Sequence, residues 1–180
     1  MSKRILLLRG INIGSNRRVA MPKLREALAA AGMKDVETYV QSGNVVVSSR
    51  KSPDKLARET ERAIAHGFGF DVDVVVRTRD ELAEVVKRNP LGDVADNPKR
   101  YQVSFLSEPP DPGVVADLAK LVHESECLVA DGRELYAWHP EGVARSKLWA
   151  ALAGTKLGVT ATARNWTTVT TLLEMADGKD

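Results

Sequence analysis

The sequence is poor in cysteine and has no long apolar run. Cys127 is the only cysteine among 180 residues, so no intrachain disulfide can form and no oxidising compartment is indicated. No apolar run approaches the roughly 20 residues that a membrane-spanning helix needs. At the N-terminus, Lys3 and Arg4 precede only about four apolar residues, too few for a signal peptide. We therefore expect a cytoplasmic protein with no membrane partner.

Acidic residues are absent from the start of the chain. The first 25 residues carry seven Lys or Arg side chains and no Asp or Glu. Residues 1–90 have a net charge of +6, and residues 91–180 have a net charge of −4. A basic half attracts phosphate-bearing ligands. A merely solvated charged surface explains the same asymmetry.

The composition is that of a globular protein, because 43% of the residues are hydrophobic and 28% are charged. In the first half, the patterns predict strands at 4–8, 36–41, 44–49 and 72–77. Helices are predicted from Pro22, from a cap at Ser52, and from a capping box at residues 78–81. Gly43 lies between two of these strands and predicts a hairpin with a two-residue turn at 42–43.

The second half repeats this order of elements more weakly. Strands are predicted at 101–106, 126–129, 134–138 and 158–163, with a turn at 131–133. A helix capped by Asp111 would carry its apolar face as far as Val122. A second helix is predicted at 143–152, and a last one after Asn165.

These patterns predict an α+β protein of two ferredoxin-like subdomains, each with the order βαββαβ plus a helix. We expect the subdomains at residues 1–92 and 99–180, with a linker at 93–98. The strand runs at residues 5–8, 45–47 and 74–76 are continuously apolar, so both faces of the sheet should be covered. That leaves no free sheet face on which bases could stack.

The first candidate site is the glycine-containing loop at residues 9–18. Glycines let backbone N–H groups approach an anion, and the following helix start adds a partial positive charge. The candidate ligand-binding residues are Arg9, Asn12, Asn16, Arg17 and Arg18. The spacing matches neither of the glycine-rich nucleotide motifs. A polar connection with solvated arginines is the alternative interpretation.

The second candidate is the segment at residues 39–44, where Gln41, Ser42 and Asn44 carry amide and hydroxyl groups able to bind a base or a sugar. Alternatively, this is a turn that needs Gly43 for a positive φ, with Asn44 bonding locally.

The third candidate lies before the last helix. Arg164 could bind an anion there, with Asn165 beside it and Trp166 stacking on a ligand. The alternative is that Asn165 caps the helix and Trp166 belongs to the core.

The sequence contains no recognisable catalytic set or metal site. His66, His123 and His139 have no metal-ligand spacing with Cys127 or with carboxylates. Ser146 and Lys147 lie inside a predicted helix, where adjacent side chains diverge. We expect no metal and no cofactor, and the catalytic residues, if the protein has any, stay unknown.

Three segments together resemble a known protein family. Residues 8–14 (LRGINIG), 39–45 (YVQSGNV) and 162–168 (TARNWTT) are similar to the signature of domain-of-unknown-function family 1697. The resemblance covers residues 4 to about 175. It implies a bacterial α+β protein of two ferredoxin-like subdomains, and it implies no reaction or ligand. The chain departs from the family at residues 16–18, where a lysine-containing loop is expected.

The topology limits how these segments combine. We expect the loop at 9–18 and the hairpin at 41–44 to lie at opposite ends of their sheet. In the second half, we expect the segment after the last strand to lie at the same end as the turn at 131–133. Residues 164–166 would then be able to meet one of the first two segments across the interface between the halves.

Three hypotheses follow. The first is a protein that binds an anionic, phosphate-bearing ligand such as a nucleotide or nucleic acid. The second is a metal-independent enzyme acting on a phosphorylated metabolite. The third is a structural or interaction protein with no small-molecule site. The sequence leaves a homodimer open and does not decide whether the protein is an enzyme.

Overall fold

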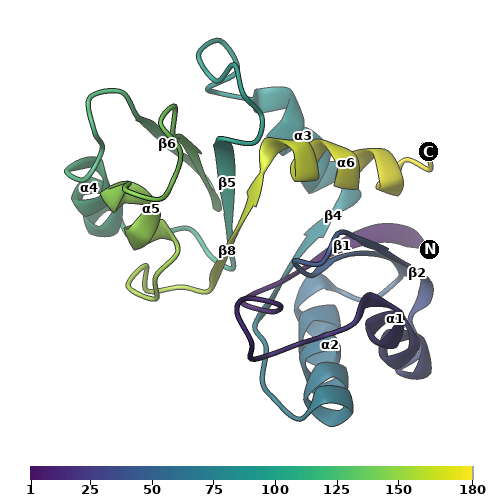
Figure 1. The fold of residues 1–180 in the computed structure, drawn as a ribbon. Coiled ribbons are helices and arrows are strands. Elements are labelled where there is room, and N and C mark those ends of the chain that lie inside the picture. Colours follow the sequence, from purple (N-terminus) through teal and green to yellow (C-terminus); the bar gives the residue numbers. More distant parts are fainter. Residues whose placement is uncertain (180) are drawn as a thin grey trace. The chain divides into compact units, whose positions relative to one another are not determined.

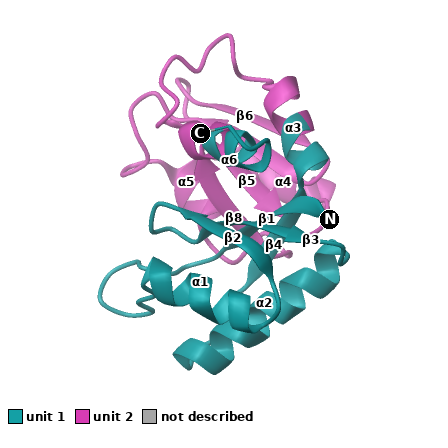
Figure 2. Ribbon diagram, turned by 90° about the vertical axis from the view of Figure 1, so that its right-hand side faces the viewer, with its two compact units in different colours: residues 1–83, 171–180 teal, residues 84–170 magenta. Residues whose placement is uncertain are grey.

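The computed structural model describes residues 1–179, which form two compact units. Unit 1 comprises residues 1–83 and 171–180, and unit 2 comprises residues 84–170 (Figure 2). The division falls inside two helices, α3 (Arg79–Arg88) and α6 (Trp166–Ala176). The subdomain limits expected from the sequence, 1–92 and 99–180, stay a prediction.

Unit 1 contains a four-stranded antiparallel sheet in the order β2-β3-β1-β4. Its strands are β1 (Ser2–Leu8), β2 (Lys34–Tyr39), β3 (Asn44–Ser49) and β4 (Val74–Thr78). Helices α1 (Met21–Ala30) and α2 (Pro53–Phe68) lie on one side of this sheet (Figure 1).

Local chemistry explains where the helices of unit 1 begin and end. Ser52 accepts a hydrogen bond from the backbone of Lys55, and α2 ends at Gly69 in the left-handed conformation. At the start of α3, Thr78 N donates to Glu81 Oε2 at 2.8 Å, and Glu81 N donates to Thr78 Oγ1 at 3.1 Å. This reciprocal pair is the capping box that the sequence predicts.

The apolar runs of β1, β3 and β4 are buried on both faces of the unit 1 sheet, whereas β2 is exposed or half-buried. On the helix side, Leu6, Leu8, Val45 and Val47 pack in one core with side chains of α1 and α2. The alternate strand residues, Ile5, Leu7 and Val46, are also fully buried. The continuous apolar runs therefore have the double-sided burial that the sequence predicts.

Unit 2 has the same pattern of strand pairing, in the order β6-β7-β5-β8. Its strands are β5 (Tyr101–Leu106), β6 (Cys127–Asp131), β7 (Glu134–Trp138) and β8 (Ala161–Asn165), and its helices are α4 (Pro112–Ala119) and α5 (Lys147–Leu152). A core that includes Leu118, Leu135 and Leu148 joins both helices to the sheet. The protein is thus a mixed α+β molecule with two four-stranded antiparallel sheets and two similar units.

Several predicted bounds differ from the structure by a few residues, and three of these differences shape the loops described below. Helix α4 ends at Ala119, so Leu121 and Val122 lie beyond it. Helix α5 starts only at Lys147, with Ser146 as its N-cap. The β2–β3 turn has four residues, from Val40 to Gly43, where two were predicted. Lys120 and the left-handed Val40 end α4 and β2 before their predicted limits, and Ser146 starts α5 after its predicted limit. The apolar pattern marks none of these three limits.

The register of β1 corrects the expected placement of the first two candidate segments. Leu7 pairs with Asn44, whereas Ser2 pairs with Ser49. The end of β1 therefore adjoins the start of β3, and the loop at 9–18 lies at the same edge as the β2–β3 hairpin. The prediction of opposite ends was wrong. Strands β1 and β2 run in the same direction because β3, between them, is antiparallel to both, so their carboxyl ends share an edge.

The corresponding expectation for unit 2 was also wrong. Leu106, at the end of β5, donates its backbone N–H to Arg133 in the β6–β7 turn at 2.9 Å. Asn165, at the end of β8, pairs instead with Gln102 near the start of β5. The turn and the end of β8 therefore lie at opposite edges of the sheet.

In residues 1–179 no helix combines the length and the apolar character that crossing a membrane requires. The cytoplasmic location expected from the sequence stays a prediction.

Candidate functional site

Three segments of unit 1 meet at one edge of its sheet: residues 9–18, the hairpin turn 40–43, and residues 69–73 before β4. We call this surface the loop–hairpin edge. Leu8 N donates to Gly43 O at 2.9 Å, and Arg9 N donates to Asp73 O at 2.9 Å. Backbone hydrogen bonds from the last residue of β1 and the first residue of the loop therefore hold the three segments together.

Asn12 fixes the shape of the loop. Its Oδ1 accepts from Val19 N at 2.8 Å, and its Nδ2 donates to Val19 O at 2.9 Å. The same Nδ2 donates to Gln41 O at 2.7 Å. One amide thus closes the loop on itself and joins it to the hairpin, so the two sequence motifs lie side by side.

Two arginines belong to the same loop as Asn12. Arg17 lies over the ring of Phe70, 5.3 Å from its centroid, and donates to the carbonyl oxygen of Asp71. Arg18 is exposed. The cation–π contact and the hydrogen bond orient Arg17, while Arg18 extends into solvent. Asp71 and Asp73 are exposed at the same edge and reduce its net positive charge.

The tip of the loop and the start of α1 present backbone donors. Within residues 1–179, no hydrogen bond satisfies the backbone N–H groups of residues 13–16, which are exposed. The N-cap of α1 is Ala20, which offers no capping side chain, and the first helical turn contains no acidic residue. The positive end of the helix dipole is therefore not neutralised by the protein itself.

The backbone of this edge is strained. Three of its non-glycine residues have positive φ: Asn12 at 54°, Arg17 at 57° and Val40 at 48°. Val40 is the most costly of these because its side chain is branched at Cβ. Strained backbone of this kind clusters at functional sites.

Residues of the hairpin differ in their availability to a ligand. Gln41 and Ser42 are exposed, whereas Asn44 is fully buried. Asn44 Nδ2 donates to Tyr39 O at 3.1 Å and to Ser42 Oγ at 2.9 Å. Asn44 thus stabilises the turn, and Gln41 and Ser42 are the polar side chains of the hairpin that a ligand can reach.

The third candidate segment lies at the end of β8 and the start of α6, and its contacts are those of a well-packed structure. Arg164 is buried, and burial lowers its pKa to about 10. Asn165 Oδ1 accepts from Thr168 N at 2.9 Å and caps α6. The ring of Trp166 stacks on Tyr101 with centroids 4.7 Å apart. A ligand-binding role for this segment stays a prediction.

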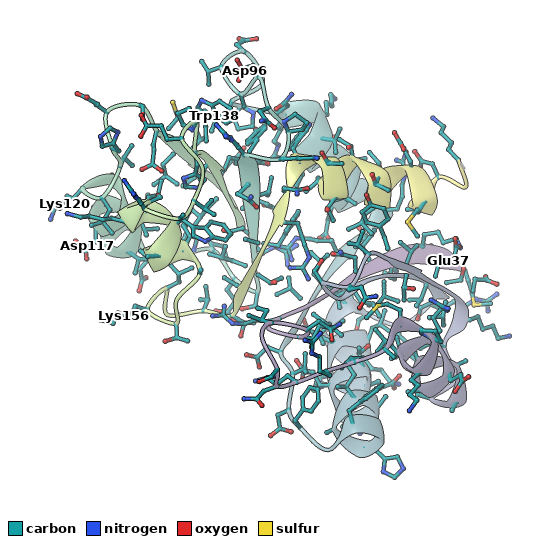
Figure 3. All side chains as sticks on the ribbon, in the orientation of Figure 1. Glu37, Asp96, Asp117, Lys120, Trp138 and Lys156 are labelled. Atoms are coloured by element: carbon teal, nitrogen blue, oxygen red, sulfur yellow. The ribbon has the colours of Figure 1, made fainter. Side chains whose placement is uncertain are left out.

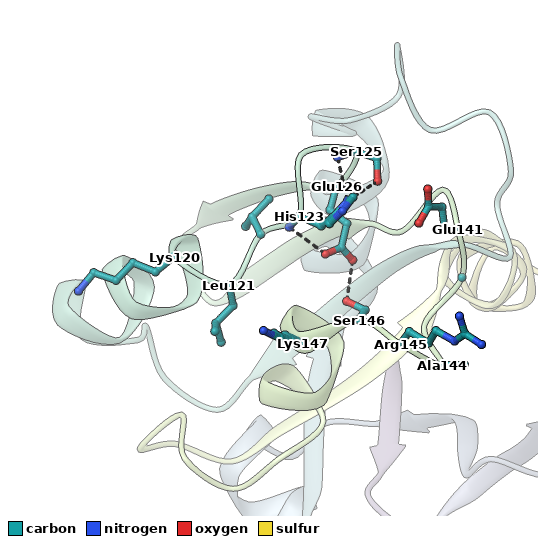
Figure 4. Close-up of a pocket in the computed structure, with 12 residues that line it drawn as sticks. Lys120, Leu121, His123, Ser125, Glu126, Glu141, Ala144, Arg145, Ser146 and Lys147 are labelled. Atoms are coloured by element: carbon teal, nitrogen blue, oxygen red, sulfur yellow. Dashed lines mark hydrogen bonds between the residues drawn. The ribbon is translucent and has the colours of Figure 1, made fainter.

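A pocket in unit 2 was not foreseen from the sequence. It lies between residues 120–126, which follow α4, and residues 141–147, which lead into α5 (Figure 4). Its volume is about 740 Å³. The early end of α4 and the late start of α5 leave both segments irregular. The late start of α5 had one signal in the sequence: Ser146 is a residue type favoured at helix starts.

A hydrogen-bond network forms one wall of the pocket, and Glu126 is its centre. Glu126 Oε2 accepts from Ser146 Oγ at 2.6 Å and contacts His139 Nδ1, while Oε1 accepts from His123 N at 3.1 Å. Burial raises the pKa of the Glu126 carboxyl, but the hydrogen bonds from Ser146, His139 and His123 outweigh burial and leave this pKa below its usual value.

This network does not have the geometry of a serine-hydrolase triad. In a triad, the imidazole uses one nitrogen for the carboxylate and the other for the serine. Here Ser146 Oγ lies 3.3 Å from His139 Nδ1, the same nitrogen that contacts Glu126. Ser146 Oγ also accepts from Trp149 N at 3.0 Å as the cap of α5. The network therefore braces the start of α5.

Among residues 1–179, no group of three or more His, Cys, Asp or Glu side chains is placed to hold a metal ion.

Comparison with known proteins identifies the family. The family described as "Protein of unknown function (DUF1697)" matches residues 1–136. The chain belongs to this family. The match confirms the resemblance to this family, and the matched range contains the first two of the three motifs.

A solved structure has a similar fold. Conserved bacterial protein SP0830 from Streptococcus pneumoniae matches with a TM-score of 0.78 and 24% sequence identity, over 97% of this chain and 98% of that one. At this level of identity the likeness concerns the fold alone. No curated protein matches the chain.

Proposed function

We propose that the loop–hairpin edge of unit 1 binds a phosphate-bearing ligand, such as a nucleotide or a nucleic acid. The observation that carries this proposal is the Asn12–Gln41 hydrogen bond of 2.7 Å. It joins the basic loop to the hairpin, so guanidinium groups and exposed amide and hydroxyl groups belong to one surface.

The charges and donors of this edge suit a phosphate group. Arg17 and Arg18 are exposed cations, and guanidinium groups bind phosphate oxygens through two parallel hydrogen bonds. The uncapped start of α1 and the exposed amides of residues 13–16 add backbone donors for the same oxygens.

Apolar side chains at the same edge suit the rest of such a ligand. Ile13 is 74% exposed and Val40 is 51% exposed, one on the loop and one on the hairpin. They can contact a sugar or a base while the arginines bind phosphate. The burial of β1, β3 and β4 also supports an edge site, because these strands present no open face to a ligand. The order β2-β3-β1-β4 supports a ferredoxin-like class for each unit, which forms part of this proposal.

A thermal-shift measurement tests the proposed function. ATP and a short single-stranded DNA are added to the wild type, to Arg18→Gln, and to Arg50→Gln as the matched control. Arg50 is exposed and follows β3 at the opposite edge of the same sheet. A ligand present at 100 times its Kd stabilises a fold by about 2.7 kcal/mol, a clear rise in Tm.

We expect at least one ligand to raise the Tm of the wild type and of Arg50→Gln, and to raise that of Arg18→Gln much less. The proposal fails if neither ligand changes the Tm, or if the two variants respond alike.

A further inference from the structure

The pocket of unit 2 has the size and the lining of a small-molecule site. Its volume of about 740 Å³ lies within the range of about 300–1,000 Å³ typical of such sites. It is bounded by the segment after α4 and by the segment that leads into α5. All of its lining residues belong to unit 2, so it is separate from the loop–hairpin edge.

Positive charge predominates in the lining. Three cationic side chains, Lys120, Arg145 and Lys147, face two carboxylates, Glu126 and Glu141. The Glu126 carboxylate is already engaged by its hydrogen bonds within the pocket wall. The Glu126 carboxylate is therefore occupied within the wall, and Glu141 is the other carboxylate of the lining. The three cations stay available to a ligand.

The cations differ in how they are held. Lys120 is paired with Asp117 at 3.5 Å, and both side chains are more than three-quarters exposed, so this pair is weak (Figure 3). Lys147 is the first residue of α5, directly after Ser146. Because Ser146 is bonded both to Glu126 and to Trp149 N, the backbone at Lys147 is fixed. The network thus positions one cation at the pocket.

The pocket also offers apolar contact. Leu121 is 36% exposed and lines the pocket beside Val122. Figure 4 shows Lys147 extending toward the end where Leu121 lies, and Arg145 extending toward the opposite end. A ligand that fits this lining carries an anionic group for Lys147 and an apolar body for the wall at Leu121.

From this arrangement we infer that the pocket of unit 2 binds a small organic anion, a phosphate monoester or a carboxylate, with Lys147 as its principal charged contact. Ser146, Glu126 and His139 are positioning residues: they hold the start of α5 and so hold Lys147. This site is independent of the function proposed for unit 1, since it uses none of the residues of the loop–hairpin edge.

Amide chemical shifts of the full ¹⁵N-labelled chain test this inference. The probes are phenyl phosphate, benzoate, and neutral benzyl alcohol as the uncharged match. We expect saturable shifts at the amides of residues 120–126 and 141–147 with at least one of the two anions, and much weaker binding of benzyl alcohol. A response to phenyl phosphate alone, to benzoate alone or to both identifies the anionic group that the pocket takes.

Variants assign the contact. Lys147→Gln removes the charge and keeps most of the side chain, and we expect binding to weaken roughly ten-fold, as for the loss of one charge-assisted hydrogen bond. Arg145→Gln provides a second, independent loss of charge. Lys156→Gln is the matched control, because Lys156 is exposed in the loop after α5 and is not part of the pocket (Figure 3).

The spectra of the variants also report whether each is folded. The inference is overturned if neither anion shifts these amides saturably, if benzyl alcohol binds as tightly as the anions, or if Lys147→Gln binds the anions like the wild type. The test reads residues of unit 2 only, so its failure is distinguishable from a failure of the unit 1 proposal.

Discussion

Val40 has both a strained backbone and an exposed side chain. Its φ is 48°, although it is branched at Cβ, and its side chain is 51% exposed. The left-handed conformation costs an ordinary residue about 1–2 kcal/mol, and little packing is available at an exposed site to offset this. The strained conformation of Val40 does not stabilise the fold. It is more readily explained by a contact that the exposed side chain makes.

Replacing Val40 by asparagine should therefore stabilise the protein. Asparagine tolerates the left-handed region, so we expect Val40→Asn to raise the free energy of unfolding by about 1 kcal/mol. Urea denaturation measures the change. Val94→Asn is the control, because Val94 is 50% exposed and does not have a positive φ. A loss of stability in Val40→Asn would show that Val40 packs usefully in this turn.

Gly43 is constrained by space as well as by conformation. Its φ is 86°, and a Cβ placed there would lie 2.6 Å from the Cβ of Leu8. Gly10 also has a positive φ, 69°, but a Cβ there would meet no atom within 4 Å. The two glycines therefore separate the cost of conformation from the cost of close approach.

We expect Gly43→Ala to lower the free energy of unfolding by roughly 2–4 kcal/mol, and Gly10→Ala by about 1–2 kcal/mol. Urea denaturation of both variants checks the difference. Equal losses of stability would mean that the hairpin can move away from β1 without cost. That would contradict the close approach of Gly43 to Leu8.

At the scale of elements, the sequence predicted the helix starts that a local capping motif marks, but it missed the end of α4 and the start of α5. The capping box of α3 and the cap of α2 each depend on neighbours in the chain, and both were foreseen. Helix α4 ends before its apolar pattern does, because Leu121 and Val122 belong to the following segment. A periodic run of apolar residues does not by itself show where the backbone leaves the helix.

The Glu126 network connects three elements of unit 2. Glu126 directly precedes β6, His139 directly follows β7, and Ser146 caps α5. Such contacts between distant residues leave no pattern in the sequence. Ser146 and Lys147 were expected inside a longer helix, and the structure instead places Ser146 at its start, where its hydroxyl reaches Glu126.

The network makes a prediction about pH. The pKa of Glu126 lies below its usual value of 4.5 in the folded protein, so the ionised carboxylate stabilises the fold above that value. This stabilisation is lost as the pH falls through the lower pKa of the folded state. We expect Glu126→Gln to cost about 1–3 kcal/mol at pH 7, and the difference from the wild type to shrink below about pH 4.5.

Urea denaturation at a series of pH values measures this difference. Glu124→Gln is the control: Glu124 is an exposed neighbour, and its replacement should change stability by no more than about 0.5 kcal/mol. A loss in Glu126→Gln that is the same at pH 7 and pH 3 would show that the carboxylate charge does not stabilise this network.

At the scale of the whole molecule, the chain contains two units with the same strand pairing and different candidate sites. In unit 1 the site is an exposed edge, and in unit 2 it is a pocket. Residue types in the motifs were enough to predict the candidates in unit 1. Bringing the loop and the hairpin together required the antiparallel register of β1 and β3, which was misjudged from the sequence.

The central claim is that phosphate groups bind at the loop–hairpin edge. The salt dependence of oligonucleotide binding tests it most directly, because each phosphate contact adds about −0.7 to the slope of log K against log salt concentration for a single strand. The measurement uses the fluorescence anisotropy of a labelled single-stranded DNA with the wild type, Arg18→Gln and Arg50→Gln.

We predict that Arg18→Gln weakens binding and makes this slope shallower by about 0.7, while Arg50→Gln keeps the slope of the wild type. An equal slope in all three proteins, or no binding by the wild type at low salt, would contradict the account.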